Sequence, residues 1–237
     1  MPSNHPAPAE RLIVALDLPN PQEAHSLVER LDGVASFFKV GLELYTATGP
    51  GFVRELIAAG KKVFLDCKFL DIEGTVRRSA RVAADLGVSF LTVHADQKVV
   101  RAAVRGAEGT NLKILAVTVL TSMSDADLQE EGFQCSVQEL VLRRARRAIE
   151  AGCHGIVASG QEAAAIRSLP GGFIIVTPGI RSAGADRHEQ QRSTTPQQAI
   201  AAGADYLVVG RPIRDAADPR RAAEQIIREI SEAAGCR

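Results

Sequence analysis

The stretch VFLDCKFLDIEGTVRRSARVAADLG, residues 63–87, indicates the fold of the whole chain. It begins with an apolar run at residues 63–65, which lacks polar alternation and therefore predicts a short strand buried on both faces. An amphipathic, Ala-rich stretch over residues 75–86 predicts a helix, and Gly87 follows its last turn, where a positive φ is favoured. A buried strand followed by a helix is the repeating unit of parallel α/β folds.

The same alternation of strand and helix recurs eight times along the 237 residues. Eight units predict an α/β fold of one domain, a closed (β/α)8 or TIM barrel over residues 11–237, after a flexible tail over residues 1–10. A doubly wound open sheet is the alternative, but no Gly-rich dinucleotide fingerprint follows the first strand. The strands are expected at residues 12–16, 37–40, 63–65, 90–93, 114–120, 155–158, 173–176 and 206–209, and the helices at residues 21–31, 51–59, 75–86, 98–107, 137–151, 161–168, 196–202 and 218–234.

Composition and charge exclude several classes of protein. The 28 Lys and Arg balance the 28 Asp and Glu, so the basic excess typical of nucleic-acid or membrane-surface binding is missing. No apolar run approaches the roughly 20 residues of a membrane span, and residues 1–10 do not have the pattern of a signal peptide. The four cysteines have neither zinc-ligand nor disulfide-framework spacing. We therefore expect a reduced, cytoplasmic protein that binds neither nucleic acid nor membranes.

Charged and hydroxyl-bearing residues follow most of the predicted strands. In a (β/α)8 barrel the carboxyl ends of all strands meet on one face, where active sites are built. A charge at the end of one buried strand is ordinary, but charges at the ends of at least five strands indicate a shared site. These residues are Asp17, Lys39, Asp66, Lys68, His94, Thr121, Arg181 and Arg211.

Three residues after the third predicted strand suggest acid–base chemistry. Asp66 and Lys68 lie two positions apart, so their side chains share one face of an extended chain, and Asp71 follows in the turn. Together with Lys39 they predict an array of two cations and two carboxylates, in which each carboxylate needs a neighbouring cation. A fixed ammonium in such an array can donate a proton to a developing carbanion. A purely structural ion-pair network is the competing interpretation.

The last strand predicts an anion site. Gly210 and Arg211 follow it directly, and the loops after strands seven and eight often bind phosphate in these barrels. Arg181 and a glutamine of the long polar loop, Gln190 or Gln191, could close over the same group. His94 has no matching His or carboxylate partners, so we predict no metal site.

The motifs together resemble one known family. Asp66-Cys67-Lys68-Phe69-Leu70-Asp71-Ile72, with Thr75, resembles the D-x-K-F-x-D-I-x-x-T signature of bacterial-type, monofunctional orotidine 5′-phosphate decarboxylases. The D-x-K-x-x-D core alone is shared with related sugar-phosphate enzymes. Its combination with T-P-G-I-R at residues 177–181 and G-R-P-I at residues 210–213 is specific. The chain departs from the family pattern at Cys67, Leu70 and residues 73–74, none of which is a charged catalytic position.

The resemblance implies a lyase of de novo pyrimidine (UMP) biosynthesis that converts orotidine 5′-monophosphate to UMP and carbon dioxide without metal or cofactor. It implies a homodimer in which Asp71, Ile72 and Thr75 reach into the partner's site. The family's spacing favours Gln190 over Gln191. By the same resemblance Lys68 protonates C6, Asp66 and Asp71 flank the substrate carboxylate, Asp17 and Lys39 bind ribose, Thr121 contacts the pyrimidine, Gln190 bridges base and phosphate, and Arg181, Gly210 and Arg211 bind phosphate.

Two other functions remain open at this point. The nearest rival is a metal-dependent sugar-phosphate lyase or aldolase of the same barrel group, similar to hexulose-phosphate synthase. A phosphate-ligand-binding barrel without activity is the second, although the intact set of Asp66, Lys68 and Asp71 argues against it.

Overall fold

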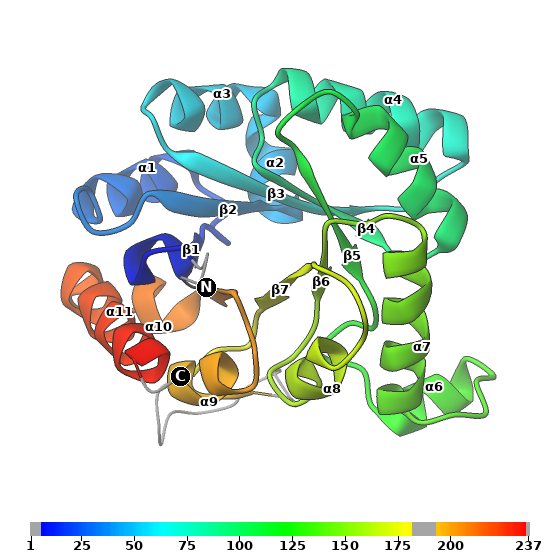
Figure 1. Ribbon diagram of the computed structural model, residues 1–237. Helices are drawn as coiled ribbons and strands as arrows, with labels where there is room; N and C mark the ends of the chain where they lie inside the picture. Colours follow the sequence, from blue (N-terminus) through cyan, green and yellow to red (C-terminus); the bar gives the residue numbers. More distant parts are fainter. Residues whose placement is uncertain (1–5, 182–192, 236–237) are drawn as a thin grey trace.

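Eight parallel strands form the centre of the molecule in the computed structural model, which describes residues 6–181 and 193–235 (Figure 1). Each strand pairs with the next, and β1 pairs with β8 through Val14 and Val209, so the sheet closes into a barrel without edges. This confirms the predicted TIM barrel. The strands are β1 (Leu12–Ala15), β2 (Phe37–Gly41), β3 (Lys62–Phe69), β4 (Phe90–His94), β5 (Lys113–Val117), β6 (Gly155–Val157), β7 (Ile174–Thr177) and β8 (Tyr206–Val209).

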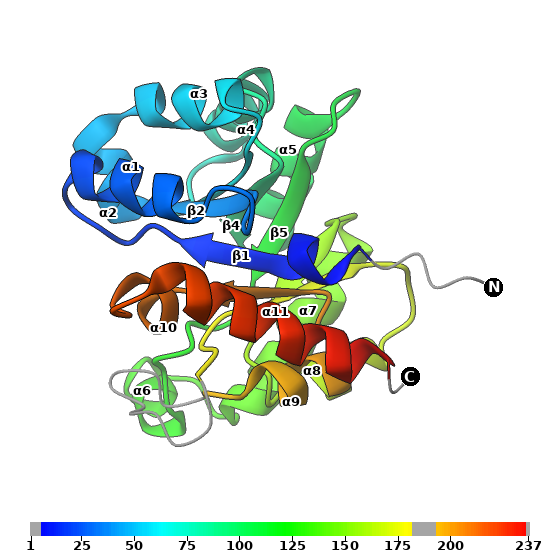
Figure 2. The same ribbon diagram turned by 90° about the vertical axis from the view of Figure 1, so that its left-hand side faces the viewer.

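Helices surround the barrel, and α11 lies between α1 and α9 along its side (Figure 2). All eight predicted helices occur with shifted ends, but four short helices, η1, α2, α6 and α10, were not predicted. None of the helices in the described part of the chain is long and apolar enough to cross a bilayer. The helices are η1 (Pro8–Arg11), α1 (Pro21–Arg30), α2 (Leu42–Thr48), α3 (Pro50–Ala58), α4 (Glu73–Asp85), α5 (Gln97–Ala107), α6 (Asp125–Glu130), α7 (Val137–Glu150), α8 (Ala163–Arg167), α9 (Pro196–Ala201), α10 (Arg211–Arg214) and α11 (Pro219–Gly235).

The short helix η1 corrects the prediction of a tail over residues 1–10, of which residues 1–5 lie outside the described part. Buried Arg11 donates hydrogen bonds to the carbonyl oxygens of Asp205 (2.8 Å) and Ala204 (2.7 Å). Glu10 pairs with Lys62 at 3.0 Å. Because Arg11 precedes β1 and Asp205 precedes β8, these bonds fasten the beginnings of the two strands that close the barrel.

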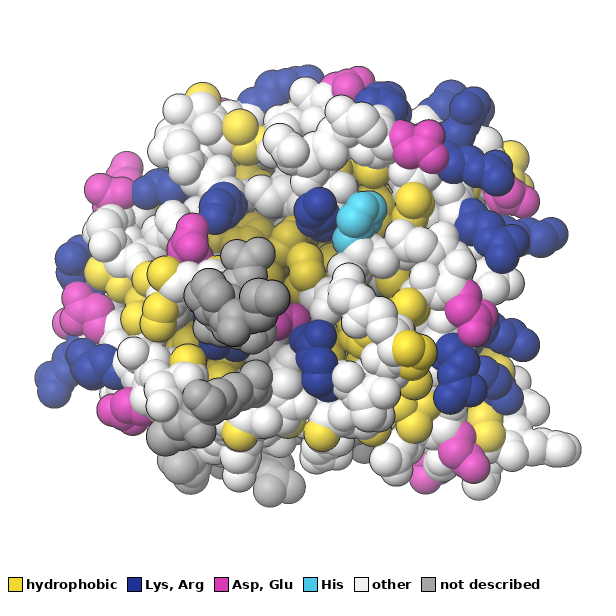
Figure 3. Space-filling model, viewed as in Figure 1, with side chains coloured by type: hydrophobic (Ala, Val, Ile, Leu, Met, Phe, Trp, Pro, Cys, Tyr) yellow, Lys and Arg dark blue, Asp and Glu magenta, His cyan; other side chains and the backbone are white. Residues whose placement is uncertain are grey.

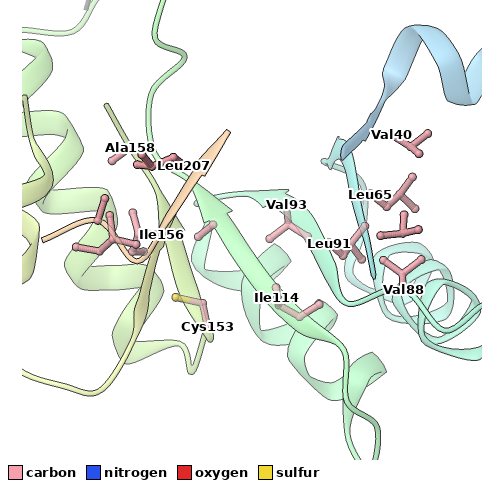
Figure 4. Packing of buried hydrophobic residues seen from close by; sticks show 14 of the residues in the cluster. Val40, Leu65, Val88, Leu91, Val93, Ile114, Cys153, Ile156, Ala158 and Leu207 are labelled. Atoms are coloured by element: carbon pink, nitrogen blue, oxygen red, sulfur yellow. The ribbon is translucent and has the colours of Figure 1, made fainter. Parts of the chain in front are cut away.

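Two apolar layers hold the barrel together. The outer layer lies between the strands and the helices, where residues such as Leu91, Val93 and Ile156 pack (Figure 4). The inner layer fills the barrel itself and contains a cluster of aromatic rings, with the centroids of Phe37 and Phe90 5.0 Å apart. Its members are Ile13, Ala15, Phe37, Phe64, Phe90, Leu115, Val176 and Val208.

Candidate active site

A cavity of about 550 Å³ opens at the carboxyl ends of the strands. Figure 3 views the molecule from the amino ends of the strands, so this cavity lies on the face turned away from the viewer, at the end to which the β1 arrow points in Figure 2. Among the described residues that line it, the positive charges outnumber the negative ones, so the cavity suits an anionic ligand. The positively charged side chains are Lys39, Lys68, Arg181, Arg211 and Arg214, and the negatively charged ones are Asp17 and Asp66.

Strand alternation explains why charges line the cavity. Phe37 and Phe64 point into the barrel, and residues two positions further along a strand point to the same side. Lys39 and Asp66 therefore also point inward, one layer nearer the carboxyl ends, and both line the cavity. The aromatic rings below them form an apolar floor, and Lys39 and Asp66 are largely buried above it, which strengthens the interaction between their charges.

Four charged side chains form a continuous row of ion pairs across the layer that contains Lys39 and Asp66. The Lys39 ammonium lies 2.6 Å from Asp17 Oδ1 and 3.7 Å from Asp66 Oδ2. The Lys68 ammonium lies 3.0 Å from both oxygens of Asp66. Asp66 thus stands between two lysines, as the sequence predicted, and Asp17 completes the alternation at one end.

The environment of Asp66 keeps it ionised. Burial alone would raise the pKa of this carboxyl, but the charges of Lys39 and Lys68 and the hydrogen bonds to it hold the pKa below its ordinary value. An ionised Asp66 in turn fixes the position of both ammonium groups. Three of the four predicted members of the array, Lys39, Asp66 and Lys68, are therefore brought together within one chain.

Asp71 does not join the array in its own chain, so its predicted place beside a Lys68 stays a prediction that involves the partner's site. Its carboxylate is exposed and accepts a hydrogen bond from the Ile72 N–H at 2.6 Å. It lines a second hollow, with Asp96 and Lys98 among the neighbours. Asp17 takes the fourth place in the array. Asp71, Ile72 and Thr75 are absent from the described lining of the main cavity, so their predicted roles need a second subunit.

Lys68 has an unusual backbone conformation. Its φ is +47°, the one positive φ of a residue other than glycine in the described part of the chain. The register of β3 against β4 shifts between Leu65 and Phe69, so Lys68 lies in an irregular part of the strand. Asp66 and Lys68 still face the same cavity, but through this irregularity and not through the regular extended chain that the sequence argument assumed.

Thr92, which was not among the predicted site residues, supports this irregular segment. Its side chain is fully buried on β4. The hydroxyl donates to Asp66 Oδ1 at 2.8 Å and accepts a hydrogen bond from the Lys68 N–H at 3.0 Å. A signal for it exists in the sequence, because Thr92 lies two residues after inward-facing Phe90 and hence on the same face as Asp66.

The predicted anion side of the cavity contains Arg181, Gly210 and Arg211. Arg181 and Arg211 both line the cavity, and burial and the nearby charge of Arg211 lower the pKa of Arg181. Arg181 donates to the Ile180 carbonyl at 2.7 Å. A Cβ at Gly210 would make ordinary contact with Ala15 at 3.5 Å, so no group of the described chain requires glycine there.

Arg214 is a cavity residue that the sequence argument did not select. It lies three positions after Arg211 on α10, and its Nη1 donates to the Asp17 carbonyl at 2.6 Å. Its Nε pairs with Asp215 at 2.6 Å. The three-residue spacing from Arg211 would have been the signal, because such residues share one face of a helix.

The far wall of the cavity is apolar and contains Thr121. Val117, Val119 and Leu120 lie beside it. The predicted fifth strand extends to residue 120, but β5 ends at Val117, so Thr121 lies on the loop before α6. Gln190 lies outside the described residues.

No group of three or more His, Cys, Asp or Glu side chains in the described ranges has the arrangement of a metal site. His94, which ends β4, is half-buried, and burial lowers its pKa, with Arg144 and Lys68 adding to the effect. The predicted lack of a metal requirement stays a prediction.

Comparison with known proteins agrees with the geometry. Residues 10–226 match the model of the orotidine 5′-phosphate decarboxylase / HUMPS family. A relative from Nitrobacter winogradskyi named orotidine 5′-phosphate decarboxylase is 53% identical over 225 residues, 94% of each chain. One of the same name from Afipia carboxidovorans is 52% identical over 227 residues, which are 95% of this chain and 97% of the relative.

Solved structures agree as well. The crystal structure of orotidine 5′-phosphate decarboxylase from Lactobacillus acidophilus superposes with a TM-score of 0.83 at 36% identity, covering 93% of this chain and 99% of that one. The corresponding structure from Pyrococcus horikoshii gives a TM-score of 0.75 at 28% identity, covering 93% and 99%. The resemblance of the motifs is thereby confirmed: the chain belongs to the orotidine 5′-phosphate decarboxylase / HUMPS family.

Proposed function

We propose that this protein is an orotidine 5′-phosphate decarboxylase, a carboxy-lyase that converts orotidine 5′-monophosphate to UMP and carbon dioxide in pyrimidine biosynthesis. The observation that carries the proposal is the chain Asp17–Lys39–Asp66–Lys68, which lies in one cavity with Arg181 and Arg211. Two relatives more than 50% identical over most of their length carry this name and support it.

The parts of the substrate match the parts of the cavity. Its phosphate needs cationic donors, which Arg181 and Arg211 supply as bidentate, charge-assisted forks, with Gln190 and Gly210 as further expected contacts. The ribose hydroxyls fit the Asp17–Lys39 pair, which can both donate and accept hydrogen bonds. The pyrimidine ring lies between these groups, against the apolar wall with Thr121.

The chemical step uses the Lys68 ammonium as acid. The bond between C6 and the carboxylate carbon breaks, its electron pair stays on C6, and carbon dioxide leaves. Lys68 donates one proton to C6, forms the new C6–H bond and regains its proton from solvent. A fixed ammonium stabilises the charge that develops on C6 more in the transition state than in the ground state, which is the condition for acceleration.

Asp66 has two effects in this scheme. It holds the Lys68 ammonium at 3.0 Å and keeps it on the side of the cavity where C6 is expected. Its negative charge also lies near the place of the substrate carboxylate, which favours loss of that group as neutral carbon dioxide. The scheme needs no metal and no cofactor.

A homodimer completes the proposed site. Leu70 and Ile72 are 63% and 74% exposed beside Asp71, which is unusual for large apolar side chains in one short loop. A second copy that covers this loop would bury them and would receive Asp71, Ile72 and Thr75 at its own cavity. A location in the cytoplasm is part of the same proposal.

The first test is an assay with orotidine 5′-monophosphate in the presence of EDTA, which follows the absorbance change on UMP formation. We expect turnover in EDTA, and a loss of kcat by about 100- to 10,000-fold in Lys68→Ala with UMP binding retained. Lys113→Ala, which removes an exposed lysine at the opposite end of the barrel, is the matched control. Near-normal kcat in Lys68→Ala would contradict the role of Lys68. A magnesium requirement without UMP formation would favour the sugar-phosphate lyase, and tight UMP binding without turnover in the wild type would favour a binding barrel.

The second test concerns sharing of sites between subunits. Lys68→Ala and Asp71→Asn are each expected to lose activity alone. Mixed dimers of the two variants should regain activity, because one of their two sites then has both native residues. A mixture that forms mixed dimers and stays inactive would show that each site is built within one chain.

A further inference from the structure

We propose that Thr92 is a positioning residue that sets the geometry of Asp66 and Lys68 for proton transfer. The inference rests on the proposed function, in which these two side chains do the chemistry. Thr92 is absent from the described lining of the cavity and is fully buried, so it acts through its two neighbours and not on the substrate.

The Thr92 hydroxyl uses both of its hydrogen-bonding capacities. Its single proton is donated to Asp66 Oδ1 at 2.8 Å, and a lone pair accepts the Lys68 N–H at 3.0 Å. One side chain therefore joins the carboxylate of Asp66 to the backbone that carries Lys68. With the proton given to the carboxylate, the direction of both bonds is fixed.

The backbone of Lys68 needs such a support. A φ of +47° is unfavourable for a residue with a Cβ and persists where neighbouring groups determine it. The regular pairing of β3 with β4 is interrupted between Leu65 and Phe69. The Lys68 N–H bonds to a side-chain oxygen of β4 in this interval, so Thr92 supplies a bond where the ladder is irregular.

The bond to Asp66 also fixes the plane of its carboxylate. Asp66 Oδ1 receives Thr92 and Lys68, and Oδ2 lies 3.0 Å from Lys68 and 3.7 Å from Lys39. Rotation of the carboxylate would change its distances to both ammonium groups at once. Thr92 is the uncharged partner that resists this rotation, because its hydrogen bond holds one of the two oxygens.

Three substitutions separate the hydroxyl from the shape of the side chain. Thr92→Val keeps the branched shape and removes both hydrogen bonds, which leaves the part-buried Lys68 N–H without its partner. Thr92→Ser keeps the hydroxyl and removes only a methyl group. Thr92→Cys is close in size to serine and bonds only weakly through sulfur, so it tests the same point with less disturbance than valine.

We expect kcat to fall about 30- to 100-fold in Thr92→Val, because a misplacement of about 1 Å at reacting groups has effects of this order. KM for orotidine 5′-monophosphate and Kd for UMP should stay within about threefold, since the proposed phosphate and ribose contacts are untouched. Thr92→Ser should keep kcat within a few-fold of the wild type, and Thr92→Cys should lie between them. Ile230→Val in α11, which removes a buried methyl group far from the cavity, controls for a simple loss of stability.

The inference is overturned if kcat of Thr92→Val equals that of the wild type, if serine and valine lower kcat equally, or if Ile230→Val lowers it as much. Should Thr92→Val not fold, the comparison of serine with cysteine decides in the same way, and equal kcat values for these two refute the role. Failure of the proposed function is a separate result, because the wild type would then form no UMP.

Discussion

The substitution Gly41→Ala should disturb the charged layer of the cavity with little effect on the fold. Gly41 ends β2 and has a φ of −86°, which any L-residue adopts without strain. A Cβ built at this position lies 2.7 Å from Asp17 Oδ1 and 3.0 Å from Lys39 Nζ. The first contact is shorter than real Cβ contacts, so the Asp17–Lys39 pair must move.

The size of the effect follows from these distances. The atoms that must move are the ends of flexible side chains, so the cost to the folded state is small. Alanine also lowers the entropy of the unfolded chain, which stabilises the folded state by about 0.4–1 kcal/mol. The free energy of unfolding should therefore change by less than about 1 kcal/mol. Lys39 lies 3.7 Å from Asp66 Oδ2. At an effective dielectric constant of about 20, moving it 1 Å further away weakens their attraction by about 1 kcal/mol, or roughly fivefold in rate. Misplaced ribose contacts add to this, so we expect kcat/KM to fall about 10- to 100-fold.

Steady-state decarboxylation and urea unfolding of the same preparation measure the two quantities. Gly51→Ala in α3 is the matched control, because a Cβ there meets no atom within 4 Å and the position is far from the cavity. The control should keep its activity. Unchanged kcat/KM in Gly41→Ala would refute the reasoning, and so would a loss of activity explained by an equal loss in the fraction of folded protein.

Three further predictions concern the fold. Gly106→Ala places a Cβ 2.4 Å from a backbone oxygen of α4, so α4 and α5 must separate. Urea unfolding should show that the free energy of unfolding falls by about 1–3 kcal/mol, and an unchanged midpoint would contradict the close contact. Asp205→Ala breaks a part-buried ion pair with Arg167 and leaves the buried Ile175 N–H without its acceptor at 2.8 Å. We therefore expect about 1–3 kcal/mol of destabilisation in the same assay, and an unchanged midpoint would argue against this cluster. His154 Nδ1 accepts the Ile114 N–H at 3.0 Å, and burial, with a lysine charge nearby, lowers its pKa. The unfolded chain therefore binds a proton near pH 6.5 that the folded chain does not yet bind, so Tm should fall as the pH decreases below about 6.5, and His154→Asn should reduce this slope.

The alternation of strands and helices was predictable because strands buried on both faces are continuous apolar runs. Their ends were less predictable, as β5 shows. The sequence after Val117 continues with β-favouring residues, yet the strand ends there. The carbonyl of Thr118 accepts a hydrogen bond from Arg144 Nη1 at 2.8 Å, a contact between segments far apart in the sequence. Such a tertiary bond leaves no local signal.

Most of the charged site was predictable from one rule, that the carboxyl ends of barrel strands meet. The rule placed Asp66 and Lys68 correctly, because both lie on a strand whose direction is fixed by the sheet. Within one chain it does not extend to Asp71, since the turn into α4 directs this side chain to another hollow, and the predicted place of Asp71 in the partner's site stays a prediction. Thr92 was missed because an uncharged hydroxyl inside an apolar strand is common in protein cores. Its role depends on the irregular backbone of Lys68, whose N–H donates to this hydroxyl, and the sequence does not reveal that irregularity.

The competing interpretation of the charges as a structural ion-pair network can be weighed by charge balance and exposure. A network that serves stability alone is closed, because an uncompensated charge in a buried place is costly. The described lining of this cavity has five cationic groups and two carboxylates. Asp17 and Lys68, at the two ends of the array of ion pairs, have side chains that are 44% and 35% exposed. Lys39 and Asp66, which lie between them, are 9% and 15% exposed. The array is thus buried in its middle and open at its ends, and the excess of positive charge in the same cavity comes from Arg181, Arg211 and Arg214. Such an arrangement favours binding of an anionic ligand over a structural role.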